Sequence, residues 1–253
     1  MHTVSELKIN KKSRLDVVLV AKGLVLSRSQ GESYIKLGKV TVNGNIVKRA
    51  GTLVRETDNI VLTLAEQYVS RAGLKLASVS SILGLQFKDK TVLDIGSSTG
   101  GFTDYSLKHG AKKVVAVELG KNQLHPSLHK DSRVELHEQT DIRSYAANLE
   151  LYKDFDIMVA DISFMSLRDI LPSIIKIANP STQIVAMVKP QFEAIKSFQK
   201  HHGVIKNERI RRDILQDFEI WVKDKFVIIN KADSDIPGAK GNQERFYLLK
   251  IKP

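Results

Sequence analysis

The chain has 253 residues, of which 42% are hydrophobic and 26% charged, an ordinary composition for a globular protein with room for a small and a medium domain. It has no cysteine, which excludes disulfides, thiolate metal sites and a cysteine nucleophile. No apolar run approaches the roughly 18 residues that span a bilayer, and the polar first residues lack the apolar stretch of a secretory signal, so we expect a cytoplasmic protein.

The net charge is +11 at pH 7 and is unevenly distributed. Residues 1–65 hold 11 Lys and Arg against 5 Asp and Glu, so about half of the excess lies in a quarter of the chain. A compact basic segment attracts a phosphate backbone, although charge kept for solubility alone would give the same count. The distribution favours nucleic acid as a partner.

The first third of the chain predicts two short helices and a small sheet. Apolar residues at helical spacing mark 14–22, and Ser27 is a candidate N-cap for a second helix that Gly38 ends. In VTVNGNIV (40–47), the Asn-Gly pair between β-branched runs indicates a hairpin, because both turn positions need positive φ. A further strand is expected at 59–65. We expect a compact domain of two helices and a short sheet over 1–64 and a linker over 65–72.

From there on, apolar runs alternate with amphipathic stretches, which predicts a doubly wound, Rossmann-like α/β domain over 73–253 with a seven-stranded sheet. The expected strands are 91–96, 113–119, 134–138, 156–163, 183–190, 225–230 and 245–251, with helices at 101–109, 166–177 and 207–223. The last two strands leave no room for a helix between them, so we expect an antiparallel pair at one edge.

A nucleoside site is predicted where the first strand of this domain ends in a glycine-rich turn, since ligands of such folds sit beyond the carboxyl ends of the strands. The spacing departs from the G-x-G-x-x-G fingerprint, which disfavours a nicotinamide-dependent oxidoreductase. The second strand ends at Glu118, whose carboxylate can accept hydrogen bonds from ribose hydroxyls. Asp141 follows the third strand, within reach of an adenine amino group. The candidate cofactor residues are Asp94, Gly96, Ser97, Gly100, Gly101, Glu118 and Asp141.

Four further residues are expected at strand ends or in loops on the same rim: Lys75, Asp161, Lys189 and Glu244. Each by itself could be an ordinary surface residue. Together they resemble the Lys-Asp-Lys-Glu tetrad of FtsJ/RrmJ-like ribose 2′-O-methyltransferases. Over nearly its whole length the chain resembles the TlyA family, which is also named haemolysin. The segments that carry this resemblance are RLDVVLV, SRSQ, KVTVNG, YVSRAGLKL, LDIGSSTGGFTD, VVAVELGKNQL, ADISFMSL, VKPQFE and IPGAKGNQERF.

This resemblance implies an S-adenosylmethionine-dependent enzyme that methylates the ribose 2′-hydroxyl of cytidine in ribosomal RNA, free or in ribosomal subunits. It makes Lys75, Asp161, Lys189 and Glu244 the catalytic set, with Lys189 either deprotonating or orienting the hydroxyl. Glu118 stands where an aspartate is expected. The N-terminal segments resemble the RNA-binding module first seen in a small-subunit ribosomal protein. The basic residues of this part are the candidate phosphate contacts: Arg14, Lys22, Arg28, Lys36, Lys39, Lys48 and Arg49.

Two absences favour ribose over base as the acceptor. The corresponding segment here, Asp161-Ile162-Ser163-Phe164, lacks the prolines of the Asn/Asp-Pro-Pro-aromatic loop that serves exocyclic amines. Methylation at pyrimidine C5 generally needs a cysteine, and the chain has none. We expect no metal site, because the adjacent His201 and His202 cannot form one alone, and we expect a monomer. A non-catalytic ribosome-assembly factor and, given the family's name, a cytolysin remain as alternatives.

Overall fold

The structure is a computed structural model, and it describes residues 12–63, 67–148, 154–197, 203–238 and 240–252. The chain divides into two compact units, Met1–Gln67 and Tyr68–Pro253. The predicted linker falls around this division, but residues 64–66 lie outside the described part, so its bounds stay a prediction. His201 and His202 also lie outside it.

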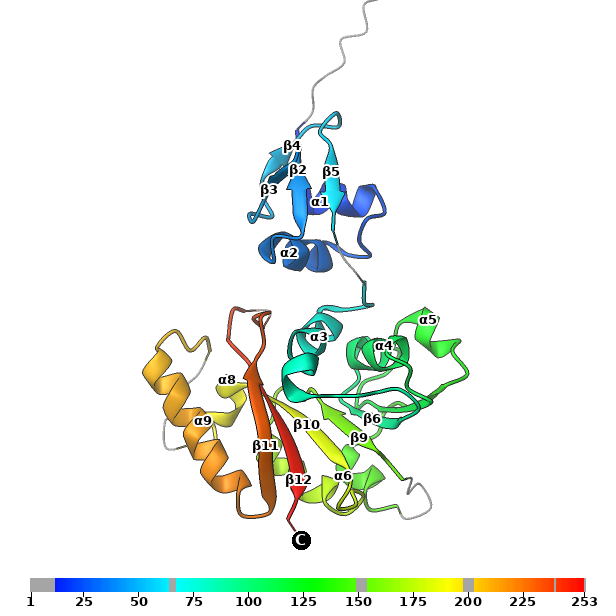
Figure 1. The fold of residues 1–253 in the computed structure, drawn as a ribbon, viewed down its shortest axis with the longest axis vertical. Helices are drawn as coiled ribbons and strands as arrows, with labels where there is room; N and C mark the ends of the chain where they lie inside the picture. The colour runs from blue at the N-terminus through cyan, green and yellow to red at the C-terminus, as the bar shows by residue number, and fades with distance from the viewer. Residues whose placement is uncertain (1–11, 64–66, 149–153, 198–202, 239, 253) are drawn as a thin grey trace, which may run out of the picture. The chain divides into compact units, whose positions relative to one another are not determined.

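The first unit contains the two predicted helices and the predicted hairpin (Figure 1). Ser27 accepts a hydrogen bond from the backbone N–H of Gln30 and so caps the second helix, as its position in the sequence predicts. Asn43 and Gly44 have φ of 52° and 82° and form the hairpin turn. The elements are β1 (Ser13–Arg14), α1 (Leu15–Ala21), α2 (Arg28–Lys36), β2 (Val40–Val42), β3 (Asn45–Ile46), β4 (Leu53–Val54) and β5 (Ile60–Leu62).

The second unit is built on a seven-stranded sheet of order β11-β12-β10-β9-β6-β7-β8. Neighbouring strands from β10 to β8 are parallel, and β12 is antiparallel to both β10 and β11. The mostly parallel sheet and the antiparallel pair at its edge are therefore both confirmed. The strands are β6 (Thr91–Ile95), β7 (Lys113–Val117), β8 (Val134–His137), β9 (Ile157–Ala160), β10 (Gln183–Val188), β11 (Phe226–Asp233) and β12 (Arg245–Ile251).

Helices bury both faces of this sheet, because strands in the middle of a parallel sheet are apolar on both sides. On one face, side chains of α6, α7 and α9 such as Tyr145, Ile174 and Phe218 join strand residues in a single apolar core. On the other face α3 and α4 pack together, and Phe102 of α4 contacts Phe246 of β12. The helices are α3 (Arg71–Leu83), α4 (Gly101–Lys108), α5 (Pro126–His129), α6 (Ile142–Tyr145), α7 (Leu171–Ile174), α8 (Pro190–Glu193) and α9 (Glu208–Val222), with a 3-10 turn η2 (Leu167–Asp169).

Several short elements are present that the sequence analysis does not predict, and three further differences bear on the site. No helix is predicted where α3 lies, although Ser70 caps its start and Gly84, with φ of 67°, ends it. The helix expected over 166–177 is interrupted and splits into η2 and α7; Pro172, in the first turn of α7, has no backbone N–H to continue it upstream. The strand expected over 156–163 ends at Ala160, where pairing with both neighbours ends, and this leaves residues 161–163 in a loop.

Candidate active site

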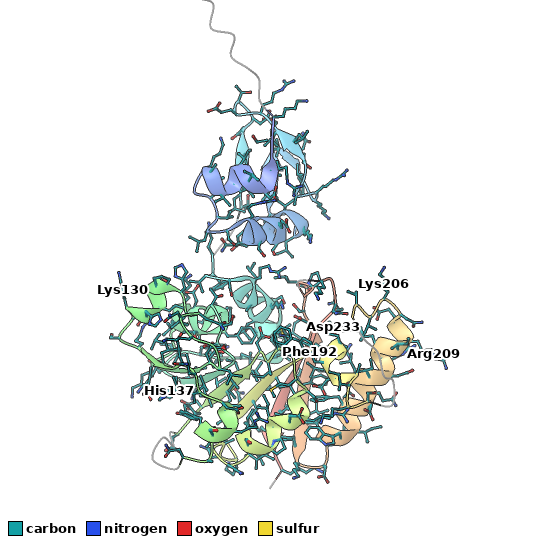
Figure 2. All side chains as sticks on the ribbon, turned by 180° about the vertical axis from the view of Figure 1, so that it is seen from behind. Lys130, His137, Phe192, Lys206, Arg209 and Asp233 are labelled. Atoms are coloured by element: carbon teal, nitrogen blue, oxygen red, sulfur yellow. The ribbon has the colours of Figure 1, made fainter. Side chains whose placement is uncertain are left out.

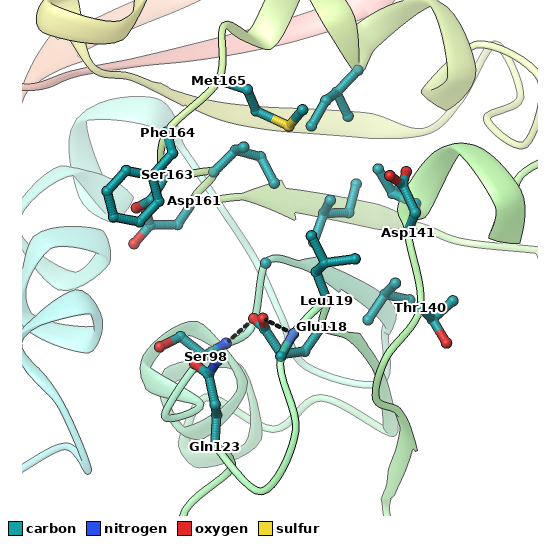
Figure 3. A pocket seen from close by; sticks show the side chains of 17 residues that line it. Ser98, Glu118, Leu119, Gln123, Thr140, Asp141, Asp161, Ser163, Phe164 and Met165 are labelled. Atoms are coloured by element: carbon teal, nitrogen blue, oxygen red, sulfur yellow. Dashed lines mark hydrogen bonds between the residues drawn. The ribbon is translucent and has the colours of Figure 1, made fainter.

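A cavity of about 440 Å³ opens at the carboxyl ends of β6, β7, β8 and β9, the edge at which a doubly wound sheet holds its ligand. Its volume lies within the roughly 300–1,000 Å³ of small-molecule sites. Apolar side chains supply most of its wall, and three carboxylates face it, those of Glu118, Asp141 and Asp161. In Figure 3, Glu118 lies between Asp161 on one side and Asp141 on the other.

Glu118 follows β7 directly and is anchored at the cavity wall by two backbone N–H groups. Ser98 N donates to its Oε2 at 2.8 Å and Gly120 N to its Oε1 at 2.7 Å (Figure 3). Each carboxylate oxygen has a second lone pair, so the group can still accept bonds from two hydroxyls. Asp141 caps α6 through Arg143 N at 2.8 Å, and the Arg143 guanidinium beside it lowers the pKa of its carboxyl.

Gly96 and Asp94 belong to the strand end beneath the cavity. A Cβ on Gly96, which has φ of 77°, would lie 2.8 Å from the carbonyl oxygen of Asp161, so this position needs glycine. Asp94 is fully buried, and its Oδ2 accepts from Thr103 Oγ1 at 2.6 Å while its Oδ1 has no hydrogen-bond partner among the described residues. Burial, followed by repulsion from Asp161 and Glu118, raises the pKa of Asp94 to about 7.

The remaining candidates of the glycine turn do not line the cavity. Ser97 is buried, and its hydroxyl makes no hydrogen bond with the described residues. Gly100 and Gly101 stand at the start of α4, where a Cβ would meet Leu128 or Ala72, respectively. Their place in the structure is one of close packing against α5 and α3.

Lys75 and Glu244 form a buried ion pair, Nζ to Oε2 at 2.5 Å, with side chains 9% and 3% exposed. The expectation that Lys75 lies at a strand end or in a loop is wrong, because it projects from the first turns of α3. Glu244 directly precedes β12, and a Cβ on Gly238 would lie 2.7 Å from its Oε1. The segment before β12 therefore folds closely over the carboxylate.

Lys189 and Asp161 form a second pair, Nζ to Oδ1 at 2.6 Å. Neither Asp161 Oδ1 nor Glu244 Oε2 has the angles of a hydrogen bond, so both pairs are ionic contacts whose oxygens can still accept from a further donor. Burial raises the pKa of Glu244, Lys75 and Lys189 lower it, and Asp161 raises it. Since all three other members act on Glu244, the four groups form one electrostatic cluster, and Asp161 joins this cluster to the cavity.

Three residues without a predicted role complete the site. Ser163 Oγ accepts a hydrogen bond from Lys189 Nζ at 2.8 Å. Phe164, with φ of 70° and 89% of its surface exposed, presents its ring at the rim and contacts Phe192. Glu193 is buried and accepts from Ser166 Oγ and Leu167 N, which ties α8 to the loop after β9. All three residues lie within the sequence segments that carry the family resemblance, but nothing in the spacing of the three distinguishes them from ordinary loop and core positions.

The seven basic candidates of the first unit are all exposed: Arg14, Lys22, Arg28, Lys36, Lys39, Lys48 and Arg49. Two of them, Arg14 and Arg28, are held in place by a buried carboxylate. The buried carboxylate of Asp16 pairs with Arg14 at 2.9 Å and with Arg28 at 2.9 Å, while the two arginine side chains stay about half exposed. Hydrogen bonding to Arg14, assisted by Arg28, lowers the pKa of Asp16 to about 2.

Comparison with known families matches residues 68–251 to the FtsJ-like methyltransferase model, the second unit almost from end to end. The chain belongs to the FtsJ-like methyltransferase family. Residues 13–60 match the S4 domain, which confirms the resemblance of the first unit. The expected fold class is thereby confirmed for both parts of the chain.

Relatives of similar length place the chain in the TlyA branch of this family. It is 40% identical to Hemolysin A of Brachyspira hyodysenteriae over 91% of this chain and 97% of that one. It is 35% identical to the 16S/23S rRNA (cytidine-2′-O)-methyltransferase TlyA of Mycobacterium tuberculosis over 96% of this chain and 91% of that one. A solved structure of a hemolysin-named protein from Streptococcus thermophilus, 33% identical, superposes with a TM-score of 0.69 over 96% of this chain and 90% of that one.

Proposed function

We propose that this member of the FtsJ-like methyltransferase family transfers a methyl group from S-adenosylmethionine to the ribose 2′-hydroxyl of a cytidine in ribosomal RNA. The observation that carries the proposal is the meeting of Lys75, Asp161, Lys189 and Glu244 beside the cavity. The TlyA relative methylates the same position of cytidine by its name. With ribosomal RNA as its substrate, we expect this enzyme to work in the cytoplasm.

The cavity suits a nucleoside that carries a positive charge. Glu118 has free lone pairs for ribose hydroxyls, and Asp141, with its lowered pKa, is an ionised acceptor for an exocyclic amine. Apolar side chains such as Leu119, Ile142 and Met165 line the space that a purine ring would fill. When bound, S-adenosylmethionine supplies a methyl group on a positively charged sulfur, and its transfer to a hydroxyl leaves a neutral thioether and releases one proton.

The chain's own residues must therefore place a hydroxyl and receive its proton. Lys189 is the group for this, because its amine lies against Asp161, which lines the cavity. Lys75 and Glu244 form the second ion pair of the cluster and balance its charge. A lysine amine that is neutral accepts the hydroxyl proton, and one that is charged orients the oxygen.

Recognition of RNA is assigned to both units. The exposed basic residues of the S4 domain contact phosphates, which give affinity and register. In the second unit, Lys130 and, near the start of α9, Lys206 and Arg209 also lie on the surface (Figure 2). The exposed ring of Phe164 at the rim offers a face on which an unpaired nucleobase can stack.

The test is methyl transfer by purified protein to ribosomal RNA and to ribosomal subunits that lack the modification. We expect labelled 2′-O-methylcytidine in the nucleoside digest. Lys189→Ala should abolish it while cofactor binding, measured by calorimetry, is retained. Lys223→Ala, an exposed lysine at the amino-terminal end of the sheet, is the matched control and should keep full activity. Label on a base, or near-normal transfer by Lys189→Ala, would refute the proposal.

The same experiment, together with a vesicle-leakage assay, separates the alternatives. A non-catalytic assembly factor would bind RNA and transfer no label. A cytolysin would release dye from vesicles, and the described residues contain no helix long and apolar enough to cross a membrane.

A further inference from the structure

The amine of Lys189 contacts more than one side chain at the site. Its Nζ lies 2.6 Å from Asp161 Oδ1 and donates a hydrogen bond to Ser163 Oγ at 2.8 Å. Both partners come from the loop that follows β9, and both line the cavity, on the same side of it in Figure 3. The Phe192 ring, 5.8 Å from Nζ, lies near the same amine.

Of these contacts, the one to Ser163 has the angles of a hydrogen bond, and the one to Asp161 Oδ1 does not. A lysine nitrogen is tetrahedral, with one bond to its own chain and three positions for hydrogens or a lone pair. Ser163 takes one of these positions as a hydrogen-bond acceptor, Asp161 attracts the amine by its charge, and the remaining positions are open to the substrate. If the amine is neutral, one of the remaining positions is the lone pair, and it can take the proton of the acceptor hydroxyl.

We propose that Ser163 is a positioning residue, whose hydroxyl fixes the rotation of the Lys189 amine so that an open position meets the acceptor hydroxyl. This inference rests on the proposed function. The contact with Asp161 alone would leave the amine free to turn about its Cε–Nζ bond, since it lacks the angles of a hydrogen bond. The hydrogen bond to Ser163 removes that freedom, because it fixes the direction of one N–H bond.

A surface serine without such a role would look different. Ser163 is exposed, yet its oxygen contacts a buried amine, that of Lys189, rather than only solvent. Ser166, three residues further on, gives the contrast. It is buried, and it donates to Glu193 at 2.6 Å, so it braces the loop without contacting Lys189.

The experiment compares Ser163→Ala, Ser163→Thr and Ser166→Ala in single-turnover methyl transfer, with cofactor affinity from calorimetry and melting temperature measured on the same full-length preparations. Ser163→Ala should slow transfer roughly 10- to 100-fold, the scale of a misplaced catalytic group, with cofactor affinity and melting temperature close to wild type. Ser163→Thr keeps the hydroxyl and should recover most of the rate. Ser166→Ala should lower the melting temperature, which identifies the effect of a loosened loop.

Three results would overturn the inference. Transfer by Ser163→Ala at the wild-type rate would show that the hydroxyl does nothing for the amine. Equal loss in the alanine and threonine variants would assign the effect to shape rather than to the hydroxyl. A loss of cofactor affinity as large as the loss of rate would place Ser163 in cofactor binding. The wild type, run beside them, keeps the two claims apart: if it makes no 2′-O-methylcytidine, the proposed function itself fails.

Discussion

The ion pair between Lys75 and Glu244 leads to a prediction about the free energy of unfolding, and the burial of the pair sets the size of the expected effect. With 2.5 Å between Nζ and Oε2 and side chains 9% and 3% exposed, water screens the two charges poorly. At an effective dielectric constant of about 20, charges at this 2.5 Å separation attract by about 7 kcal/mol. Removing one partner of a buried pair typically costs about 3–5 kcal/mol. That is a large part of the roughly 5–15 kcal/mol by which a typical domain is stable.

The perturbation is a double-mutant cycle with Lys75→Met and Glu244→Gln. Each single variant should destabilise the second unit by about 3 kcal/mol, because each strands a charge in the cluster. The double variant should be more stable than the sum of the two predicts by on the order of 2–4 kcal/mol, since neither charge is then left unpaired. All three variants should lose methyl transfer.

The assay is urea unfolding followed by the fluorescence of Trp221, the single tryptophan, which lies in α9 and so reports on the second unit. Burial already raises the pKa of Glu244, and Lys75 is the strongest influence that lowers it. In Lys75→Met the carboxyl should therefore take up a proton more readily, and the cost of this variant should shrink as the pH falls. Additive costs within about 0.5 kcal/mol, or a cost of Lys75→Met that is the same at every pH, would refute a coupled buried pair.

Two further predictions use the carboxyls beneath the two candidate binding surfaces. Because the pKa of Asp94 is raised from 3.8 to about 7, the folded protein holds a proton there that the unfolded chain releases. The stability of the wild type should therefore fall as the pH rises from about 4 to 7, by on the order of 4 kcal/mol at most. Asp94→Asn should remove most of this slope in urea unfolding at pH 5 and pH 8, and an unchanged slope would contradict the assignment. Asp16→Asn raises the net positive charge, which by itself would strengthen RNA binding, yet we expect binding roughly 2- to 10-fold weaker because Arg14 and Arg28 lose the carboxylate that fixes them. Fluorescence anisotropy with an rRNA fragment measures this, and binding as tight as wild type would show that the arginines need no fixing.

Much of the fold can be predicted from the sequence, because the signals for turns, helix caps and strands are local. The Asn43-Gly44 turn, the cap at Ser27 and the alternation of strands and helices depend on residues near one another. The turn, the cap and the seven strands predicted for the second unit are all present. The parallel sheet follows from that alternation, and it brings Glu118, Asp141 and Asp161 to one edge, where the cavity lies.

The tertiary structure decided what depends on contacts between distant segments. That Lys75 lies on a helix and pairs with Glu244 depends on how α3 packs against the sheet beside the segment before β12. The helix expected after β9 is broken, and a buried carboxylate, Glu193, ties the loop before it to α8. The hydrogen bond from Lys189 to Ser163 exists because β9 stops at Ala160 and its next residues turn toward the cavity. Spacing along a chain fixes which residues share a face of one element, but the distance between two elements is set by packing.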